Sequence, residues 1–276
     1  KAVLRYPQVA VVGPNAGGKD WNTAVIILLW LQLWDKAKVI IYGPTYRQVA
    51  DILWNEVQSR YYGAKVSLGG QMNKEPNSGY QIDPDRFAIG FSAEKPITTT
   101  GFHSPHLMLV ITEAHAVEQP HLDMLKTLQY ETLLLTGNAF SNMGEFYDAF
   151  EKPESSYHAI RIAPEDIPNV REGRTVVPGL LTRTDMERRK ADWGEDSPLY
   201  RASILAQFTK GTLGGLRNIE GCIHGEMEKP LAGRKYVASW DHARVMDYNW
   251  LLVADAQTRR VIWSDRWQLD DWDVSK

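Results

Sequence analysis

The chain has 276 residues, 43% of them hydrophobic, and a formal net charge of -3. This length and apolar content allow a buried core and favour more than one domain. Its apolar runs are shorter than the about 20 residues of a membrane-spanning helix, and its single cysteine, Cys222, excludes a disulfide framework and fits a reducing compartment. The balanced charge disfavours a dedicated nucleic-acid-binding domain, but not an enzyme that binds DNA with one face. Because the sequence begins without Met and ends within a patterned segment, we expect a piece of a longer protein.

The first predicted strand leads into a glycine-rich loop and then into a helix. Residues 9–12 form a short apolar run, and residues 24–34 are apolar enough for a packed helix. Glycines between them let backbone N–H groups converge on an anion, and a lysine adds positive charge for the outer phosphates. The segment therefore predicts a phosphate-binding P-loop, whose residues are Gly13, Pro14, Asn15, Ala16, Gly17, Gly18, Lys19 and Asp20. The last position of this motif is normally the Ser or Thr that binds Mg²⁺, and here it is Asp20.

The next segments alternate between strand and helix patterns. Residues 39–42 predict a strand, residues 48–61 an amphipathic helix, and residues 87–91 a further strand. Residues 63–80 are rich in Gly and polar side chains and predict a hairpin or loop. Three tryptophans at helical spacings are expected in the core rather than on a base-stacking surface: Trp30, Trp34 and Trp54.

The apolar residues 107–111 predict a central strand, and Thr112 and Glu113 follow it. This is the pattern of a Walker B strand, which normally ends in an Asp that holds the magnesium shell and a Glu that polarises the attacking water. Glu113 is therefore the candidate catalytic carboxylate, whereas Thr112 replaces the Asp. Compared with the usual motifs, a carboxylate replaces the hydroxyl at position 20 and a hydroxyl replaces the carboxylate at position 112. The site therefore still offers one carboxylate and one hydroxyl group for the metal. Asp20 and Thr112 are accordingly the candidate magnesium ligands.

A third apolar strand, residues 133–139, ends in the polar tip Thr136, Gly137 and Asn138. From such a position Thr136 and Asn138 could reach a γ-phosphate or its water, as a sensor does. The order of P-loop, Walker B strand and polar tip predicts nucleotide hydrolysis. Strands that alternate with helices predict an α/β fold with a mainly parallel sheet.

The second half of the chain is less regular. Further helices are predicted over residues 120–128, 144–150, 180–190 and 197–208, a strand over 157–162, and a proline-punctuated linker over 164–178. A new β pattern covers residues 236–240, 250–253 and 261–263. Asp241 follows the first of these strands, where its carboxylate would suit a divalent ion or would start a turn. A zinc site is disfavoured because the spacing is irregular and no cysteine supports the histidines 103, 106, 115 and 121.

Several segments resemble the large subunit of viral terminases, the ATP-driven DNA-packaging motors of tailed bacteriophages and related viruses. They are residues 42–49, 101–103, 144–150 and 193–201, which occur in the family's order and spacing. The resemblance implies a RecA-like P-loop ATPase domain over residues 1–170 and a linker or helical connection over 171–234. It also implies the N-terminal part of an RNase H-like nuclease domain over residues 235–276.

The same resemblance implies specific roles. Residues 13–19 would bind ATP, Glu113 would be catalytic, and residues 136–138 would form the coupling motif. Asp241 and Asp247 would bind metal in the nuclease, with Mg²⁺ or Mn²⁺ there and Mg²⁺ at the ATPase site. The implied partners are double-stranded viral DNA, the portal protein, the small terminase subunit and further copies in a ring, with no membrane. The implied location is the host cytoplasm, with transient docking on the procapsid.

Three points stay open at this stage. The loop residues 14–17 lack the Arg found in many family members, so the source of an arginine finger is unassigned. The acidic residues 265, 270, 271 and 273 are expected to form a solvated loop rather than a metal site. A nucleotide-binding assembly module that hydrolyses poorly is the alternative to an active motor. A helicase-type ATPase would explain the P-loop and Walker B strand, but not residues 193–201 or Asp241.

Overall fold

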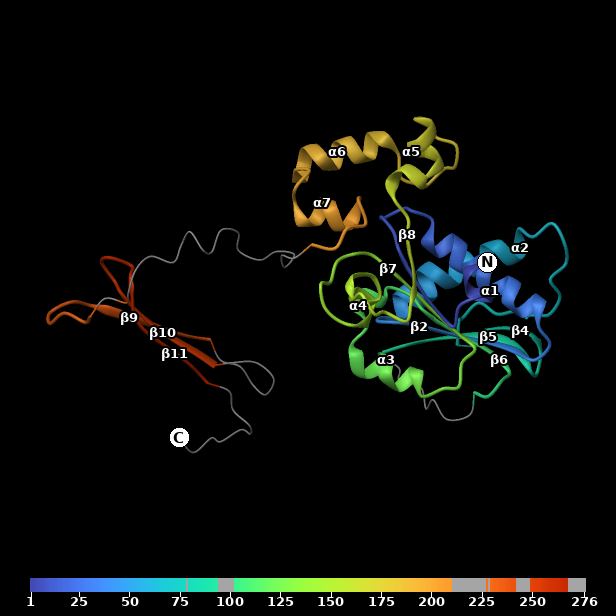
Figure 1. The fold of residues 1–276 in the computed structure, drawn as a ribbon, viewed down its shortest axis with the longest axis horizontal. Helices are drawn as coiled ribbons and strands as arrows, with labels where there is room; N and C mark the ends of the chain where they lie inside the picture. The colour runs from blue at the N-terminus through green and yellow to red at the C-terminus, as the bar shows by residue number, and fades with distance from the viewer. Residues whose placement is uncertain (78, 94–101, 210–226, 228, 242–248, 268–276) are drawn as a thin grey trace. The chain divides into compact units, whose positions relative to one another are not determined.

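A computed structural model describes residues 1–77, 79–93, 102–209, 227, 229–241 and 249–267. The chain divides into two compact units, Lys1–Gly215 and Leu216–Lys276 (Figure 1). Unit 1 contains every helix in the described part of the chain, and no helix there is long and apolar enough to cross a bilayer.

Unit 1 is built on an eight-stranded sheet with the strand order β3-β4-β5-β2-β6-β7-β1-β8. Its strands are β1 (Gln8–Val12), β2 (Ala37–Gly43), β3 (Gln71–Met72), β4 (Tyr80–Asp83), β5 (Arg86–Ser92), β6 (His106–Ile111), β7 (Thr132–Gly137) and β8 (His158–Arg161). All pairs from β5 to β8 along this order are parallel, whereas β3, β4 and β5 pair antiparallel. The predicted α/β fold with a mainly parallel sheet is confirmed.

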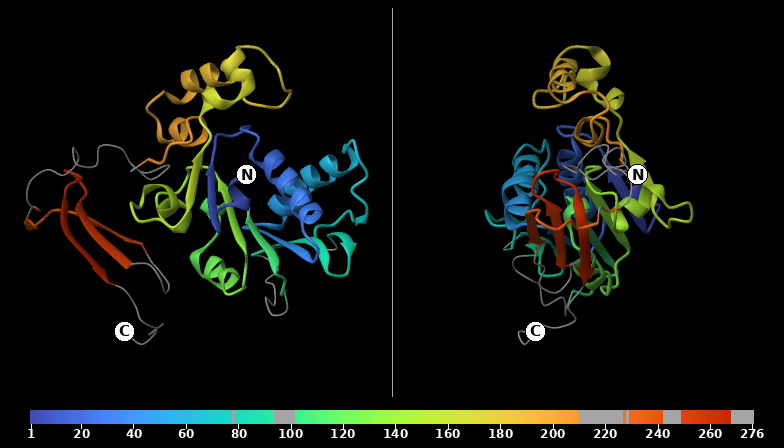
Figure 2. Two further views of the ribbon diagram at one scale, coloured as in Figure 1. Left: turned by 45° about the vertical axis from the view of Figure 1, so that its right-hand side comes forward. Right: turned by 90° about the vertical axis from the view of Figure 1, so that its left-hand side faces the viewer.

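Helices cover both faces of this sheet (Figure 2). The α-helices are α1 (Lys19–Leu33), α2 (Asn55–Tyr62), α3 (Gln119–Lys126), α4 (Glu145–Glu151), α5 (Pro168–Glu172), α6 (Arg183–Trp193) and α7 (Pro198–Ser203). A π-helix, η2 (Gln48–Trp54), leads directly into α2, and three short 3₁₀ turns are η1 (Ala2–Leu4), η3 (Ala114–Ala116) and η4 (Pro164–Asp166).

The two faces of the sheet form two separate hydrophobic cores because side chains alternate along each strand. In β2, Val39 and Ile41 pack in the core with α1 and α2, whereas Ile40 and Tyr42 pack in the core with α3 and α4. All four side chains are at most 1% exposed. Strands buried on both faces read as continuous apolar runs, which explains why the sequence pattern predicted them.

The three tryptophans at helical spacings belong to the core with α1, as predicted. Trp30 and Trp54 are 2% and 0% exposed, and Trp34 packs against the same core. Two of the indole N–H groups donate hydrogen bonds: Trp30 to the carbonyl of His106, and Trp54 to that of Asn73.

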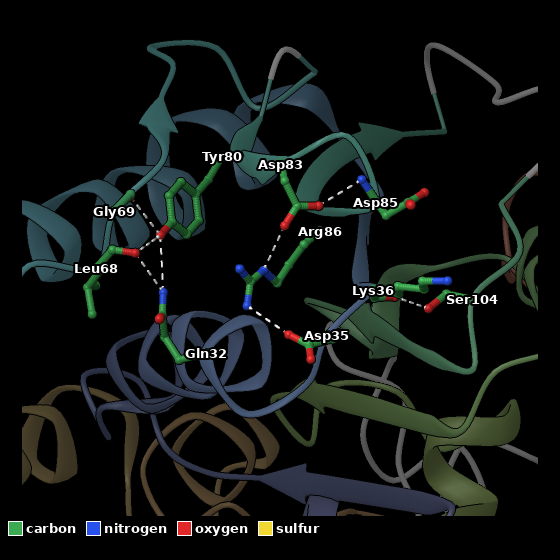
Figure 3. Close-up of polar contacts among 10 residues, drawn as sticks. All are labelled: Gln32, Asp35, Lys36, Leu68, Gly69, Tyr80, Asp83, Asp85, Arg86 and Ser104. Atoms are coloured by element: carbon green, nitrogen blue, oxygen red, sulfur yellow. Dashed lines mark hydrogen bonds and ion pairs between the residues drawn. The ribbon is translucent and has the colours of Figure 1, made fainter.

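The antiparallel extension β3-β4-β5 is tied to the end of α1 by polar contacts (Figure 3). The Tyr80 hydroxyl donates to the Leu68 carbonyl at 2.9 Å, and the Gln32 amide donates to the same carbonyl at 2.9 Å. Arg86 contacts Asp83 at 3.2 Å and Asp35 at 3.6 Å. The predicted hairpin or loop over residues 63–80 thus contains β3 and leads into β4.

Two predictions for residues 164–208 need correction. The predicted linker over 164–178 contains η4 and α5, since Pro168 occupies the first turn of α5, where its missing N–H costs nothing. The predicted helix over 197–208 ends at Ser203, and Ala206 adopts a left-handed φ of 51°. The apolar spacing of Tyr200, Ile204 and Phe208 is therefore not helical throughout.

Unit 2 contains a three-stranded antiparallel sheet in the order β11-β10-β9. Its strands are β9 (Tyr236–Asp241), β10 (Asn249–Asp255) and β11 (Val261–Trp267). The three strands expected from the sequence are present, and the first two pair antiparallel with Trp240 opposite Leu251. Backbone N–H donors, together with the Arg234 guanidinium at 2.9 Å, lower the pKa of the buried Asp255. An RNase H-like fold for this unit stays a prediction.

Candidate nucleotide-binding site

The strand order brings the three predicted motifs to one edge of the sheet. Strand β7 lies between β1, which leads into the P-loop, and β6, which leads into Thr112 and Glu113. The three strands are parallel, so their carboxyl ends meet where open α/β sheets commonly bind ligands. The tip of β7 is consequently placed between the P-loop and Glu113.

The predicted P-loop, residues 13–20, makes a tight turn that leads into α1. Gly18 precedes α1 with φ at 80°, and Ala16 has φ at 55°. A Cβ atom at Gly17 would lie 2.9 Å from the Pro14 carbonyl oxygen, so a side chain there would force the turn open. Positive φ and close backbone approach favour glycine, and they turn the loop around the first turn of α1.

Lys19 folds back onto this loop. Its side chain is buried, and Nζ donates to the carbonyl oxygens of Pro14 at 2.9 Å and Gly13 at 3.2 Å. Burial lowers the pKa of Lys19, while the negative charges of Glu113 and Asp20 raise it. The ammonium is therefore poorly solvated, and an anion over the loop would provide better acceptors than the two carbonyls.

The two predicted carboxylates lie in this neighbourhood. Burial raises the pKa of Asp20, and the Lys19 ammonium lowers it. Burial also raises the pKa of Glu113, which Lys19 lowers and Asp20 raises. Glu113 adopts a left-handed backbone with φ at 49°, a conformation that costs about 1–3 kcal/mol in a non-glycine residue and clusters at functional sites.

The hydroxyl groups of the predicted magnesium ligand Thr112 and of the predicted sensor residue Thr136 belong to more deeply buried residues. Thr112 is 2% exposed and its N–H donates to the Tyr42 carbonyl, while Thr136 is 3% exposed within β7. Asp20 and Thr112 provide the oxygen atoms that Mg²⁺ prefers. Within the described residues no group of three or more His, Cys, Asp or Glu side chains could hold a metal. A magnesium ion at this edge would thus need oxygen atoms from a phosphate or water, which is its usual mode of binding.

Asn138 joins the tip of β7 to the P-loop. Its side-chain amide donates to the Gly13 carbonyl at 2.9 Å and to the Asn15 Oδ1 atom at 3.0 Å. A backbone hydrogen bond also joins the P-loop to the tip of β7, from the Gly13 N–H to the Gly137 carbonyl at 3.3 Å. Asn138 is 3% exposed, and these bonds satisfy it.

His115 is the residue that sequence reasoning missed, having weighed it only as a zinc ligand. Its Nδ1 atom lies 3.3 Å from the Glu113 carboxyl and accepts from the Asn138 N–H at 3.3 Å. Burial, with a smaller effect from the Lys19 ammonium, lowers the pKa of His115 to about 4. Its position two residues after Glu113 was visible in the sequence, but its contact with β7 depends on the strand order.

A cavity of 370 Å³ opens beside the P-loop. Its lining includes Gly17 and Gly18, Trp21 in the first turn of α1, and the apolar side chains of Ile162 and Leu180. The wall is held to the loop by bonds from Leu181 N–H to the Ala16 carbonyl and from Asn15 N–H to the Ser203 carbonyl. Helix α5, residues 177–181 and the end of α7 therefore contribute to the surroundings of the loop.

The predicted metal ligands of the nuclease belong to unit 2. Asp241 is the last residue of β9, is exposed, and lies opposite Trp250 in the register. Asp247 lies outside the described residues. The nuclease ligands therefore stay predictions.

Comparisons with known proteins bear on the fold. No family model matches the chain, and no curated protein sequence matches it significantly. The solved large terminase of a thermophilic bacteriophage has a TM-score of 0.58 at 10% identity, over 96% of this chain and 64% of that chain. The HK97 bacteriophage large terminase has a TM-score of 0.56 at 18% identity, over 95% and 60%.

A further structure of the terminase from the thermophilic bacteriophage, in complex with ATP-γ-S, has a TM-score of 0.51 at 10% identity over 96% and 64% of the two chains. The chain thus spans 60–64% of the length of the terminases it matches. At these identities the likeness concerns the fold. The chain has the fold of the phage large terminases.

Proposed function

We propose that this chain is the ATP-hydrolysing motor subunit of a viral DNA-packaging complex. The observation that carries the proposal is the convergence of Lys19, Glu113 and Asn138 at the carboxyl ends of neighbouring parallel strands. Transfer of a phosphoryl group to water needs a cation at the phosphates, a carboxylate at the water and a polar group that senses the γ-phosphate. The fold shared with phage large terminases supports a motor of this class.

In the proposed complex the phosphates of ATP lie over the P-loop. Lys19 exchanges the Gly13 and Pro14 carbonyls for β- and γ-phosphate oxygens, because charged acceptors bind an ammonium more strongly than carbonyl dipoles. The adenine enters the 370 Å³ cavity, whose wall includes Trp21 and Leu180. A flat aromatic base suits such an apolar lining.

Glu113 is proposed to orient and polarise the attacking water. Burial raises the pKa of its carboxyl, which makes the carboxylate a stronger base than an exposed one, and the Lys19 ammonium opposes that rise. The left-handed backbone at Glu113 turns the chain directly after β6. General-base effects are typically about 10²- to 10⁴-fold.

Mg²⁺ bound with the nucleotide would neutralise charge on the β- and γ-phosphates. We propose Asp20 and Thr112 as the residues of this chain that hold it. Asp20 next to a triphosphate would otherwise be repelled, since two unit charges at 4 Å cost roughly 4 kcal/mol at an effective dielectric of 20.

We further propose that unit 2 belongs to a metal-dependent endonuclease of RNase H-like fold, with Asp241 and Asp247 as ligands of Mg²⁺ or Mn²⁺. The proposed nucleic acid is double-stranded viral DNA, which unit 1 would translocate and the nuclease would cut. The proposed partners are the portal protein, the small terminase subunit and further copies in a ring, and the proposed location is the host cytoplasm, docked on the procapsid. The resemblance of residues 42–49, 144–150 and 193–201 to terminases supports these assignments.

The test is steady-state ATP hydrolysis by the full chain, with nucleotide binding measured separately. Lys19→Ala is expected to weaken binding or abolish turnover, and Glu113→Gln to abolish turnover while binding survives. Lys65→Ala and Glu118→Gln remove the same charges from exposed positions and are the matched controls. Wild-type turnover by both Lys19→Ala and Glu113→Gln would refute the assignment.

The alternative function is a nucleotide-binding assembly module with impaired hydrolysis. The nearly complete burial of Thr112 favours it, because a ligand hydroxyl needs access to the ion. Tight ATP binding by the wild type with no turnover, either alone or with viral double-stranded DNA, would select this alternative.

A further inference from the structure

The imidazole of His115 bridges the candidate catalytic carboxylate and the tip of β7. Its Nδ1 atom lies 3.3 Å from Glu113 Oε2 and 3.3 Å from the backbone nitrogen of Asn138. Gly137 packs closely against the imidazole, since a Cβ atom there would lie 3.1 Å from Nδ1. The ring of Phe140 contacts the imidazole edge-on, with centroids 5.3 Å apart. The side chain is 14% exposed, so its position is set by packing rather than by solvent.

From His115 a continuous set of hydrogen bonds leads to the phosphate-binding lysine. Asn138, whose N–H contacts His115, donates from its side chain to the Gly13 carbonyl at 2.9 Å. Lys19 Nζ donates to the same carbonyl at 3.2 Å. Gly13 is thus a shared acceptor, and an anion that draws Lys19 away leaves its carbonyl to Asn138.

The two contacts of Nδ1 exclude one another. A neutral imidazole carries either a lone pair or a proton at Nδ1. With the lone pair it accepts from the Asn138 N–H, and with the proton it donates to the Glu113 carboxylate. The Nδ1 atom can therefore form a hydrogen bond with the Asn138 N–H or with the Glu113 carboxylate, but not with both at once.

We propose that His115 is a positioning residue that couples phosphate occupancy of the P-loop to the orientation of Glu113 through Asn138. The inference rests on the proposed ATPase function. When phosphate takes Lys19 from Gly13, Asn138 tightens on the P-loop, and His115 exchanges its contact with β7 for one with Glu113. Hydrolysis then becomes dependent on a correctly filled P-loop.

Two substitutions distinguish the contribution of the Nδ1 atom from that of the imidazole ring. His115→Asn places an amide oxygen or nitrogen near the position of Nδ1, whereas His115→Phe keeps a ring against Phe140 and removes the nitrogen. We expect His115→Asn to keep kcat within about threefold of the wild type, while kcat of His115→Phe falls by about 10- to 100-fold, the cost of a misplaced catalytic group. The KM for ATP and nucleotide binding change by less than about threefold in either variant, because neither removes a group that contacts the phosphates. Far-UV circular dichroism and a urea midpoint show that each variant is folded.

The experiment uses the full chain with ATP and Mg²⁺, and it includes Asn138→Ala alone and with His115→Phe. If the two residues act through one connection, the double variant loses no more than the poorer single variant. Equal kcat for His115→Phe and wild type overturns the coupling role, and so does a His115→Asn variant as slow as His115→Phe. A wild-type chain without turnover refutes the proposed function itself, whereas wild-type turnover that is insensitive to His115 refutes only the inference.

Discussion

Replacement of the mostly buried His115 by Asn is expected to change how the free energy of unfolding depends on pH. Burial, with a smaller effect from the Lys19 ammonium, lowers the pKa of His115 from 6.5 to about 4 in the folded protein. Between these values the unfolded chain binds more protons than the folded one, so stability rises with pH. The stability linked to His115 is fully present above pH 6.5 and is lost as the pH falls toward 4.

The size of the effect follows from the two pKa values. At about pH 5 most unfolded chains carry a protonated His115, while most folded chains keep it neutral. Linkage then lowers the stability by about 2 kcal/mol relative to about pH 7.5, since each unit of pKa difference corresponds to about 1.4 kcal/mol. The side chain is only 14% exposed, so solvent screens this effect little. Asp20 and Glu113 have raised pKa values and act in the opposite direction, but they are present in both proteins.

The assay is urea unfolding at about pH 5 and about pH 7.5, followed by far-UV circular dichroism, because all helices of the described residues lie in unit 1. The wild type should lose about 2 kcal/mol more than His115→Asn between the two pH values. His103→Asn, at an exposed position, is the matched control and should behave as the wild type does. An equal pH dependence in the wild type and His115→Asn would show that His115 is not held neutral by the fold.

Three further predictions concern separate parts of the molecule. ATP affinity, measured by titration, should depend steeply on Mg²⁺, and Asp20→Thr should strengthen binding in the absence of magnesium. The double variant Asp20→Thr with Thr112→Asp should also hydrolyse ATP. If Mg²⁺ has no effect on ATP binding by the wild type or the double variant, the proposal that Asp20 and Thr112 have exchanged roles is refuted. Leu109→Ala in β6 should destabilise unit 1 by about 2–5 kcal/mol in urea unfolding, because its fully buried side chain would leave a cavity, and a loss under about 1 kcal/mol would contradict the packing. In protein that cuts DNA with Mn²⁺, Asp241→Ala should abolish cleavage and leave ATP hydrolysis intact, whereas Asp265→Asn should leave both unchanged; cleavage that survives Asp241→Ala would reject that ligand.

The amino-acid sequence was enough to predict the fold class and to name the residues of the candidate site. Apolar runs such as residues 107–111 are long enough for buried strands and too short for helices, so they predict a sheet covered on both faces. The glycines around Lys19 predict the turn that precedes α1, because few other residues tolerate its backbone. These signals are local, and they can be read from a few neighbouring residues.

Which of these residues contact one another could be seen only in the folded sheet. The placement of β7 between β1 and β6 brings Asn138 to Gly13 and His115 to Asn138, across separations of 125 and 23 residues. Helix α7 was predicted too long for a related reason, since apolar spacing shows which side chains can be buried and not where the chain must turn toward the P-loop. Strand order follows from the packing of the whole sheet, and backbone hydrogen bonds between strands are alike for every sequence. The sequence of a single strand therefore does not show which strands will lie beside it.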